Sequence, residues 1–258
     1  MRIMIQFNEK NYAVDLTKPL DISIPIHFEG DQLSAFGAPP AEKHAYQAGD
    51  FIGDVTQGGS CNCESYTIIP HCNGTHTESI GHIAKNCIYI HDILEDSLLA
   101  ATLITIMPEE MENGDKVITG ENLKNSLAPH HARFLQALAI RTLPNAPDKV
   151  TQNYGVAMPP YFTSDAMEYI ATLGVKHLLV DMPSVDRLDD GGKLANHRIF
   201  WNVAAGDNNL QPSSKTITEL IYAPDMVKDG VYLLNLQVAA FKADAAPSRP
   251  VLYEVTPS

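Results

Sequence analysis

Histidine, cysteine and acidic residues are concentrated in one short segment of the chain, residues 70–82 (PHCNGTHTESIGH). Imidazole, thiolate and carboxylate groups are the side chains that bind zinc in proteins. If this segment is extended, its side chains alternate between two faces, and four candidate ligands then share one face. These are Cys72, His76, Glu78 and His82. The spacing therefore predicts a metal site, from which His71 points away unless Gly74 marks a β-bulge that shifts the alternation.

Other interpretations of this segment compete with a metal site. A histidine on a strand is more often a hydrogen-bonded structural residue than a ligand, and Cys72 can be a small buried residue of the core. A polar cluster can also be a solvated turn. However, a cysteine, two histidines and a glutamate on one face are difficult to bury without a partner, because unpaired polar groups are costly inside a protein. A thiolate, an imidazole and a carboxylate on one side are a plausible set of zinc ligands.

The segment resembles the signature of a known family of metal-dependent enzymes. The cyclase family, which includes bacterial kynurenine formamidases (arylformamidases) and isatin hydrolase-like enzymes, has the signature H-x-G-T-H-x-D-x-P-x-H. The chain matches it at Gly74, Thr75, His76 and His82. It differs at Cys72, Glu78 and Ile80, where the family has histidine, aspartate and proline. Both ligand changes replace one metal-binding side chain with another, which favours a retained site with altered geometry.

The resemblance continues downstream and covers about residues 14–257. Residues 175–186 (VKHLLVDMPSVD) are similar to a strand of the family and the S-x-D turn after it. Residues 195–198 (ANHR) resemble a helix that carries a metal-binding histidine, here His197. Because three separate segments agree, a chance match of one motif does not explain the resemblance.

Two assignments remain open for a late ligand. Residues 216–220 (TITEL) resemble the segment in which the family has a glutamate or glutamine ligand, here Glu219. The interval from His197 to Glu219 is 22 residues, longer than the family pattern suggests, although its polar sequence fits a loop insertion. Asn209 is therefore a competing ligand.

By this resemblance, the chain has an α/β fold of the swivelling β/β/α type and a site for Zn²⁺ or Mn²⁺. One ion is expected on Cys72, His76 and Glu78. Glu78 then bridges to a second ion held by His197 and Glu219, or its longer side chain chelates a single ion. His82 is expected to be the general base or proton shuttle.

The resemblance and the residue types together indicate hydrolysis of a small amide, formamide or lactam. A bound metal lowers the pKa of its water and polarises a carbonyl group, and a histidine that is not a ligand can move the proton to the leaving nitrogen. Two other functions use the same ligands: a metal-dependent cyclase or dehydratase, and a non-catalytic protein that binds a small ligand. His82 argues against the binder, which needs no proton carrier beside its metal.

Five further histidines and the remaining candidate residues are expected to be structural. The histidines are His71, His91, His130, His131 and His177. Trp201 and Phe51 could stack on an aromatic substrate, but core packing is expected of both. Cys61 and Cys63 lie one residue apart, which is common by chance, and four cysteines in a chain of this length do not make a disulfide scaffold.

The elements that must position these residues are short and alternate in type in the second half of the chain. A helix is predicted over residues 164–173, because capping residues precede it and a glycine follows it. A strand follows over residues 175–180, and another helix starts near Lys193 and carries His197. Further strands are predicted over residues 65–70, 98–107, 135–142, 231–240 and 251–255.

The first half is mostly β, and residues 28–63 are rich in glycine, proline and alanine, which predicts a long loop with a lid as one possibility. Together these patterns predict one domain over residues 1–258, with a mixed β-sheet and flanking helices. A doubly wound Rossmann sheet is not expected, and the sequence has neither a G-x-G-x-x-G motif nor a Walker loop for a nucleotide.

Composition and charge exclude several classes of partner. The chain has 258 residues and a net charge of −13, and such a surface repels phosphate backbones and anionic lipid heads, so neither nucleic acid nor a membrane is an expected partner. No run approaches the ~20 apolar residues of a spanning helix, and the N-terminus turns polar too early for a signal peptide. We expect a cytoplasmic protein with a small-molecule substrate, and the family's habit implies a homodimer or homotetramer.

Overall fold

Four parallel strands form the centre of the main sheet in the computed structural model, which describes residues 1–128, 134–155 and 158–258. They are β9 (Leu98–Ile106), β12 (Ala137–Thr142), β14 (His177–Val180) and β15 (Thr216–Glu219). The full strand order is β1-β2-β18-β16-β9-β12-β14-β15-β8-β17, with β3 paired to β18. The C-terminal ends of the four parallel strands lie at the same edge of the sheet, where polar side chains can converge.

Antiparallel strands extend the sheet on both sides of this centre. On one side lie β16 (Gly230–Asn235), β18 (Val251–Pro257), β2 (Lys10–Asp15), β1 (Arg2–Phe7) and β3 (Leu20–Asp21). On the other lie β8 (His76–Glu78) and β17 (Ala245–Pro247). Because β8 pairs with β15 and with β17, all three of its residues are buried although two of them are ionisable.

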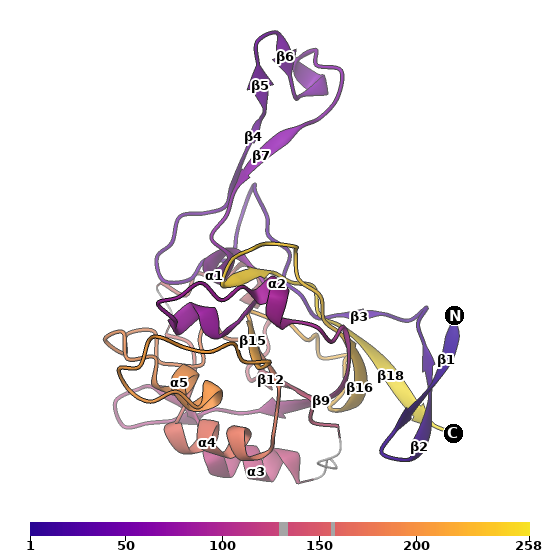
Figure 1. Cartoon of the computed structure of the whole chain (residues 1–258), viewed down its shortest axis with the longest axis vertical. Coiled ribbons are helices and arrows are strands. Elements are labelled where there is room, and N and C mark those ends of the chain that lie inside the picture. The colour runs from indigo at the N-terminus through magenta and orange to yellow at the C-terminus, as the bar shows by residue number, and fades with distance from the viewer. Residues whose placement is uncertain (129–133, 156–157) are drawn as a thin grey trace.

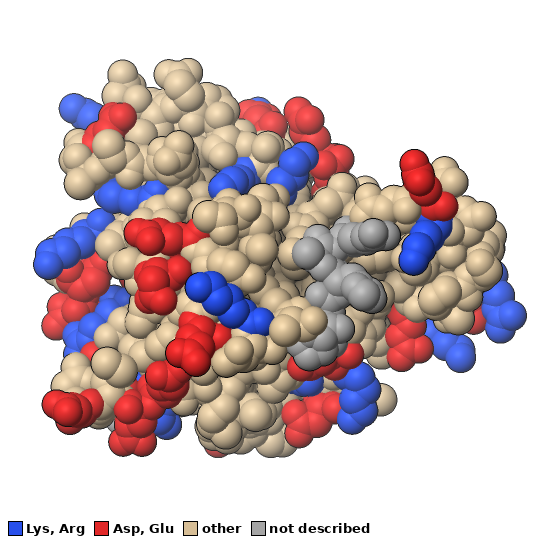
Figure 2. Space-filling view, turned by 90° about the horizontal axis from the view of Figure 1, so that it is seen from below, with Lys and Arg blue, Asp and Glu red and all other residues tan. Residues whose placement is uncertain are grey.

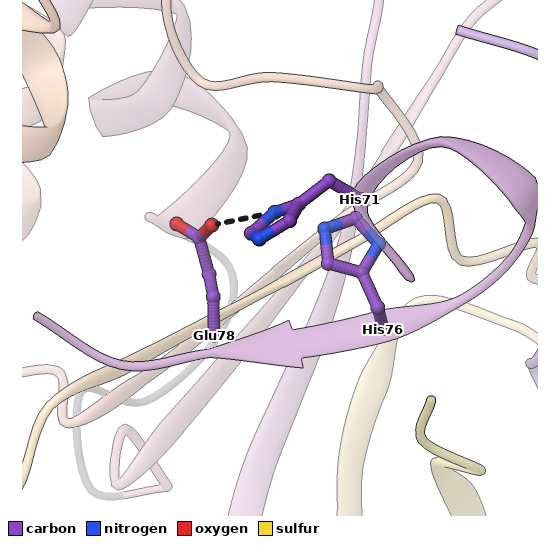
Figure 3. A group of neighbouring side chains, drawn as sticks. All are labelled: His71, His76 and Glu78. Carbon is purple, nitrogen blue, oxygen red and sulfur yellow. Dashed lines mark ion pairs between the residues drawn. The ribbon is translucent and has the colours of Figure 1, made fainter. Parts of the chain in front are cut away.

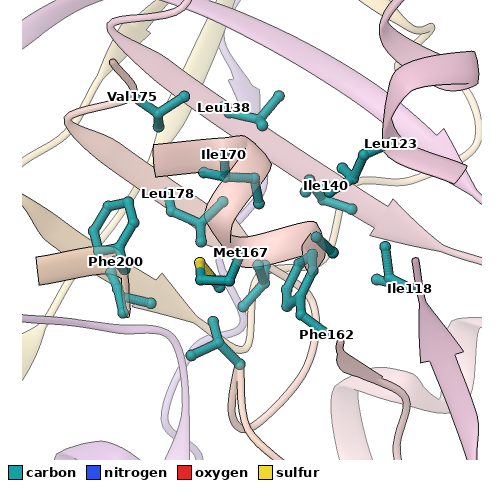
Figure 4. Packing of buried hydrophobic residues seen from close by; sticks show 14 of the residues in the cluster. Ile118, Leu123, Leu138, Ile140, Phe162, Met167, Ile170, Val175, Leu178 and Phe200 are labelled. Carbon is teal, nitrogen blue, oxygen red and sulfur yellow. The ribbon is translucent and has the colours of Figure 1, made fainter. Parts of the chain in front are cut away.

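Three helices cover one face of the central strands (Figure 1). They are α3 (Gly120–Leu127), α4 (Ser164–Thr172) and α5 (Ala195–Trp201). β12 and β14 are buried along their whole length, as expected of parallel strands. In the core between the layers, Met167 and Ile170 of α4 lie among Leu138 and Leu178 of the strands (Figure 4). This packing holds α5, and with it His197, against the sheet.

The predicted fold class, a mixed sheet with flanking helices and not a Rossmann sheet, is confirmed. The helix predicted over residues 164–173 ends one residue earlier, and Gly174 after it has the left-handed φ of +73° expected at this position. The strands predicted over residues 98–107 and 135–142 differ from β9 and β12 by one or two residues. The apolar patterns in the sequence therefore predicted β9, β12 and α4 correctly.

Shorter elements connect these layers. β10 (Glu109–Glu110), β11 (Lys116–Ile118) and β13 (Tyr161–Phe162) form a small separate sheet. Two short helices of the main body are α2 (Ile90–Ile93) and η3 (Pro147–Thr151).

Residues 28–63, expected to be a loop, contain regular structure instead. β4 (Glu42–Ala45) pairs with β7 (Glu64–Thr67), and β5 (Gln47–Ala48) pairs with β6 (Phe51–Ile52), which is followed by η1 (Val55–Gln57). We call residues 42–67 the arm, because they project from the rest of the molecule (Figure 1). The loop prediction was wrong there because short polar strands of a two-stranded ribbon lack a hydrophobic pattern.

The assumption that residues 70–82 are extended is also wrong. They form a short helix, α1 (Pro70–Asn73), then β8, then the 3₁₀-helix η2 (Ile80–Ile83). Pro70 sits at the start of α1, a position that suits its fixed φ and its missing N–H. Only His76 and Glu78 keep the strand alternation, so the argument from shared parity does not hold for Cys72 or His82.

No helix in the described ranges is both long and apolar enough to cross a membrane. On the face seen in Figure 2, Lys and Arg side chains are interspersed with Asp and Glu. The described part of that face has no continuous basic patch of the kind that binds nucleic acid.

Candidate metal centre

Five separate elements bring ionisable side chains together at the carboxyl end of β15. In the antiparallel pairing of β8 with β15, His76 lies directly opposite Glu219. Glu78, two residues further along β8, lies on the same face of the strand as His76. His197 comes from α5, and His71 and His82 come from α1 and η2.

The Glu78 carboxylate lies at the centre of this group. Its Oε1 is 3.1 Å from Nε2 of His197, and its Oε2 is 3.3 Å from Nδ1 of His71 and 3.6 Å from Nδ1 of His82. Figure 3 shows the imidazole of His71 beside this carboxylate and the ring of His76 next to that of His71. Glu219 completes the group, because its Oε2 is 3.4 Å from Nε2 of His76.

Four buried polar atoms in this group have no hydrogen-bond partner. They are Nε2 of His76, both carboxylate oxygens of Glu78 and Nε2 of His197. Such atoms are rarely left unpaired inside a protein, so they point to a ligand that satisfies them. Nitrogen and carboxylate oxygen atoms that converge within a few ångströms are the donor set of a divalent metal ion, and the residues present therefore fit one.

Three combinations of ligand atoms in the described part of the chain lie within 4.8 Å of one another. They are His71–His76–Glu78, Glu78–His82–His197 and His71–His82–Asp244. Glu78 belongs to two of these groups, so its two oxygens can serve two ions or one.

The orientation of the histidines is fixed by hydrogen bonds on the other side of each ring. Nδ1 of His76 lies 3.1 Å from the carbonyl oxygen of Gly74, and Nδ1 of His197 lies 2.6 Å from Oδ2 of Asp186. Each contact leaves Nε2 free to face the centre, an arrangement that metal-binding histidines commonly have. Asp186 is itself held, because its Oδ1 accepts a hydrogen bond from the backbone N–H of Asn196.

The electrostatics of the group are those of carboxylates surrounded by imidazoles. Burial by itself raises the pKa of Glu78, but the charges of His82 and His197 hold it well below its ordinary value. Burial lowers the pKa of His71, yet Asp244 and then Glu78 raise it to about 10. Hydrogen bonds to His71 and His82 lower the pKa of Asp244. The surrounding histidines thus favour the ionised form of both carboxylates, which is the form that can bind a cation.

Cys72 is buried but belongs to none of the three groups of converging ligand atoms among the described residues. It follows His71 in α1, and in a helix consecutive side chains point in directions about 100° apart. Burial, followed by the nearby charge of Glu219, raises the pKa of the Cys72 thiol. His71, expected to be structural, lies instead beside Glu78.

The structure also separates the two candidates for the late ligand. Glu219 lies in the centre, and its Oε1 accepts a hydrogen bond from the backbone N–H of Val185. Asn209 is exposed, and its backbone N–H donates to the Asp207 side chain. The polar residues between His197 and Glu219 form a loop, in agreement with an insertion.

The other residues considered from the sequence lie outside the centre. His177 is buried in β14 with its Nδ1 2.9 Å from Oγ1 of Thr216, and His91 is exposed. Trp201 is buried, with its ring 5.7 Å from that of His197, so it packs behind a site residue. Phe51, Cys61 and Cys63 belong to the arm. His130 and His131 lie outside the described residues.

A cavity of about 270 Å³ borders His71, His82, His197 and Glu219. Its apolar walls are Phe36, Pro183, Leu188 and Leu194, and Ser184, Arg187 and Asp190 are polar. A small molecule with an apolar portion can therefore lie in contact with the ionisable group.

Two residues near the centre were missed from the sequence. Asp244 reaches His71 because β17, which follows it, pairs with β8 from a distant part of the chain, and no local pattern shows this pairing. Phe36 adopts a φ of +55°, which is unusual for a bulky side chain, and lies in a segment whose composition suggested only a loop.

Comparison with known proteins identifies the family of this chain. The profile of the family described as "Putative cyclase" matches residues 14–187. A kynurenine formamidase of Bacillus thuringiensis subsp. konkukian is 26% identical over 197 residues, which cover 76% of this chain and 82% of that protein. A kynurenine formamidase of Bacillus anthracis is also 26% identical over the same length.

Solved structures share the fold at low sequence identity. A predicted metal-dependent hydrolase from Bacillus stearothermophilus superposes with a TM-score of 0.62 at 16% identity, covering 92% of this chain and 98% of that chain. Isatin hydrolase A from Labrenzia aggregata gives a TM-score of 0.64 at 12% identity, covering 92% of this chain and 93% of that chain.

Proposed function

The chain belongs to the cyclase family, and on that premise we propose that it is a metal-dependent hydrolase that cleaves the C–N bond of a small amide, formamide or lactam. The observation that carries this proposal is the group of buried, unpartnered ligand atoms beside a cavity. The kynurenine formamidases among its relatives support the choice of bond.

His71, His76 and Glu78 are proposed as one set of ligands, with Glu78, His197 and Glu219 as a second set. His71 is preferred to Cys72 because its Nδ1 lies 3.3 Å from Glu78, whereas the Cys72 thiol has a raised pKa and lies outside the converging group. Zn²⁺ and Mn²⁺ both suit these ligands. Such an ion, when bound, polarises a carbonyl group and lowers the pKa of a coordinated water molecule.

The protein's own residues supply orientation and proton transfer. Asp186 fixes the ring of His197 through Nδ1, and Gly74 fixes the ring of His76 in the same way. The apolar walls of the cavity can hold the non-reacting part of the substrate and exclude other water molecules. These contacts keep a carbonyl carbon in place for attack by water.

His82 is proposed as the group that moves the proton. Its Nδ1 faces the carboxylates of Glu78 and Asp244 at 3.6 and 3.5 Å, which leaves Nε2 to exchange a proton with water and substrate. Its imidazole borders the cavity. In the reaction, water adds to the carbonyl carbon, the proton passes through Nε2 of His82 to the leaving nitrogen, and the C–N bond breaks to give an acid and an amine.

The direct test is to incubate protein prepared without chelator with a panel of N-formyl arylamines, simple amides and lactams, and to follow amine or acid release. We expect turnover of at least one class, and loss of that turnover after dialysis against a chelator. Metal-containing protein that binds these compounds without turnover would instead identify a binding protein. Elimination of water from hydroxy acids would identify a dehydratase. We also expect a homo-oligomer, either a dimer or a tetramer.

A further inference from the structure

Arg187 is the one arginine or lysine among the described residues that border the cavity beside the candidate metal centre. Its side chain is 36% exposed. It comes directly after Asp186, whose carboxylate lies 2.6 Å from Nδ1 of His197. A guanidinium group keeps its positive charge at any ordinary pH. The segment that orients a histidine of the centre therefore also brings a permanent positive charge to the wall of the cavity.

The small sheet of β10, β11 and β13 holds this guanidinium in place. Nε of Arg187 donates to Oδ2 of Asp115 at 2.9 Å, and Nη2 donates to Oδ1 at 3.4 Å. Asp115 is 6% exposed, and its Oδ2 also accepts hydrogen bonds from the hydroxyl of Tyr161 and the side-chain amide of Asn113. Asp115 immediately precedes β11, and Tyr161 lies on β13, which pairs with β11. The position of the guanidinium is therefore set before any ligand binds.

The guanidinium of Arg187 has donors to spare. Arginine carries five N–H groups in a planar fork. Within the described part of the chain Arg187 uses three of them, two on Asp115 and one, on Nη1, that donates to the carbonyl oxygen of Asp189. One N–H group on Nη1 and one on Nη2 remain, and a pair of such donors is the usual partner of a carboxylate.

The two acidic residues that border the cavity are engaged elsewhere. The side chain of Asp190 accepts hydrogen bonds from three backbone N–H groups in the turn that follows it, at residues 192–194. Oε2 of Glu219 lies 3.4 Å from Nε2 of His76, inside the candidate metal centre. Among the described residues, the ion pair of Arg187 is with Asp115 and with neither of these two carboxylates. The remaining donors of Arg187 are therefore left for a ligand.

We infer that Arg187 is a specificity-determining residue that binds a carboxylate group of the substrate. The inference rests on the proposed hydrolase function and narrows its substrate class to amides, formamides or lactams that carry a carboxylate away from the scissile C–N bond. Asp115 already balances part of the charge of Arg187, so a singly charged carboxylate fits this position better than a doubly charged phosphate.

The walls of the cavity suit a molecule of this kind. The imidazoles of His82 and His197 border the same space of about 270 Å³ as Arg187, and Phe36 and Leu188 are apolar walls of it. A substrate can thus direct its carbonyl group to the histidines, its apolar body to these walls and its carboxylate to Arg187. Two polar anchors on one rigid wall fix the orientation of the scissile bond.

The first experiment compares matched pairs of substrates on the metal-containing enzyme. N-formylaminobenzoates with the carboxylate ortho, meta or para to the nitrogen are each paired with the corresponding N-formyltoluidine, in which a methyl group replaces the carboxylate. We expect kcat/KM for at least one aminobenzoate to exceed that of its neutral counterpart at least tenfold. In Arg187→Met this ratio should fall at least tenfold, mainly through KM. A preference for the neutral member of every pair, or a ratio that Arg187→Met leaves unchanged, would overturn the inference.

Further variants separate binding of the carboxylate from folding and from overall charge. Arg187→Met leaves Asp115 with a nearly buried, unpaired charge, so the double variant Asp115→Asn/Arg187→Met removes both charges together and should show the same fall in the ratio. Lys193→Met removes a positive charge from an exposed position in the same loop and should keep the ratio within about twofold. Thermal unfolding and metal content check that each variant is intact. An equal fall in Lys193→Met would make the effect one of overall charge and would contradict the inference.

A binding measurement tests Arg187 without any turnover. Calorimetry compares aminobenzoates with toluidines on the metal-containing protein, and the aminobenzoate of the preferred geometry should bind at least tenfold more tightly. This preference should disappear in Arg187→Met and in the double variant while the metal content stays the same. A preference that survives in both variants would place the carboxylate on the metal and overturn the inference. Absence of turnover with any amide would contradict the proposed function alone, whereas turnover without a carboxylate preference would contradict only the role of Arg187.

Discussion

At the scale of single residues, the buried carboxylate of Glu78 is the feature that most needs explanation. Three histidines face its two oxygens, and neither oxygen has a hydrogen-bond partner among the described residues. An ionised carboxylate is retained inside a protein only when it is paired or coordinates a cation. Glu78 is paired with these histidines, and the same arrangement of nitrogen and oxygen atoms fits a divalent cation.

The choice between His71 and Cys72 as a ligand is decided by two single substitutions. If His71 is the ligand, His71→Ala should lose most of its metal, whereas Cys72→Ser should keep it, because the buried thiol makes no contact that coordination needs. Elemental analysis of both variants, prepared without chelator, gives the metal content per chain. Metal loss in Cys72→Ser with retention in His71→Ala would restore the ligand set expected from the sequence.

His82 should affect the rate and not the metal content. A positioned acid or base typically contributes ~10²–10⁴-fold to a rate, so His82→Ala should lose kcat by about that factor. Its metal content and its KM should change little. Stoichiometry and kinetics need to be measured on the same preparation. If metal and rate fall together, His82 is a ligand, and if neither falls, it is a bystander.

At the scale of elements, the limits of sequence reasoning have physical causes. The central strands and α4 follow from long apolar patterns, because burial on a sheet selects them. The helical conformation of residues 70–73 does not follow from such a pattern, because one turn of polar residues has no periodicity to detect. His71 was therefore expected to point away from Glu78, whereas the two side chains lie 3.3 Å apart.

His177, in strand β14, should make the folding stability of the protein depend on pH. Burial lowers the pKa of this imidazole to about 4, whereas a histidine in the unfolded chain titrates near 6.5. Between these values the unfolded state binds the proton and the folded state does not, so stability falls as the pH drops from about 6.5 to 4. This difference amounts to about 3 kcal/mol.

Replacing the ring with an uncharged amide should remove that dependence. His177→Asn keeps a polar atom near Thr216 but cannot be protonated. Urea unfolding of both proteins at pH 7 and pH 4.5 gives the comparison, and the drop in stability should be smaller in the variant by about 2–3 kcal/mol. An equal drop in both proteins would show that His177 is protonated in the folded state.

At the scale of the whole molecule, the metal should contribute to folding stability. A ligand that binds only the folded state at 100 times its dissociation constant stabilises it by about 2.7 kcal/mol, which in a chain of this size corresponds to a rise in Tm of roughly 5–10 °C. Removing the metal with a chelator should lower Tm by that amount, and adding Zn²⁺ or Mn²⁺ should restore it. Addition of Mg²⁺ or Ca²⁺, which favour oxygen ligands, is the matched control.

The central claim, that these ligands hold a metal on which hydrolysis depends, is tested most directly by reconstitution. Metal-free protein is titrated with Zn²⁺ or Mn²⁺, and bound metal and hydrolysis of the best amide or lactam are measured in each sample. We predict that activity rises in proportion to bound metal and stops rising at one or two ions per chain, and that His76→Ala shows neither binding nor activity. Full activity in protein with less than about 0.2 metal ions per chain would contradict the account.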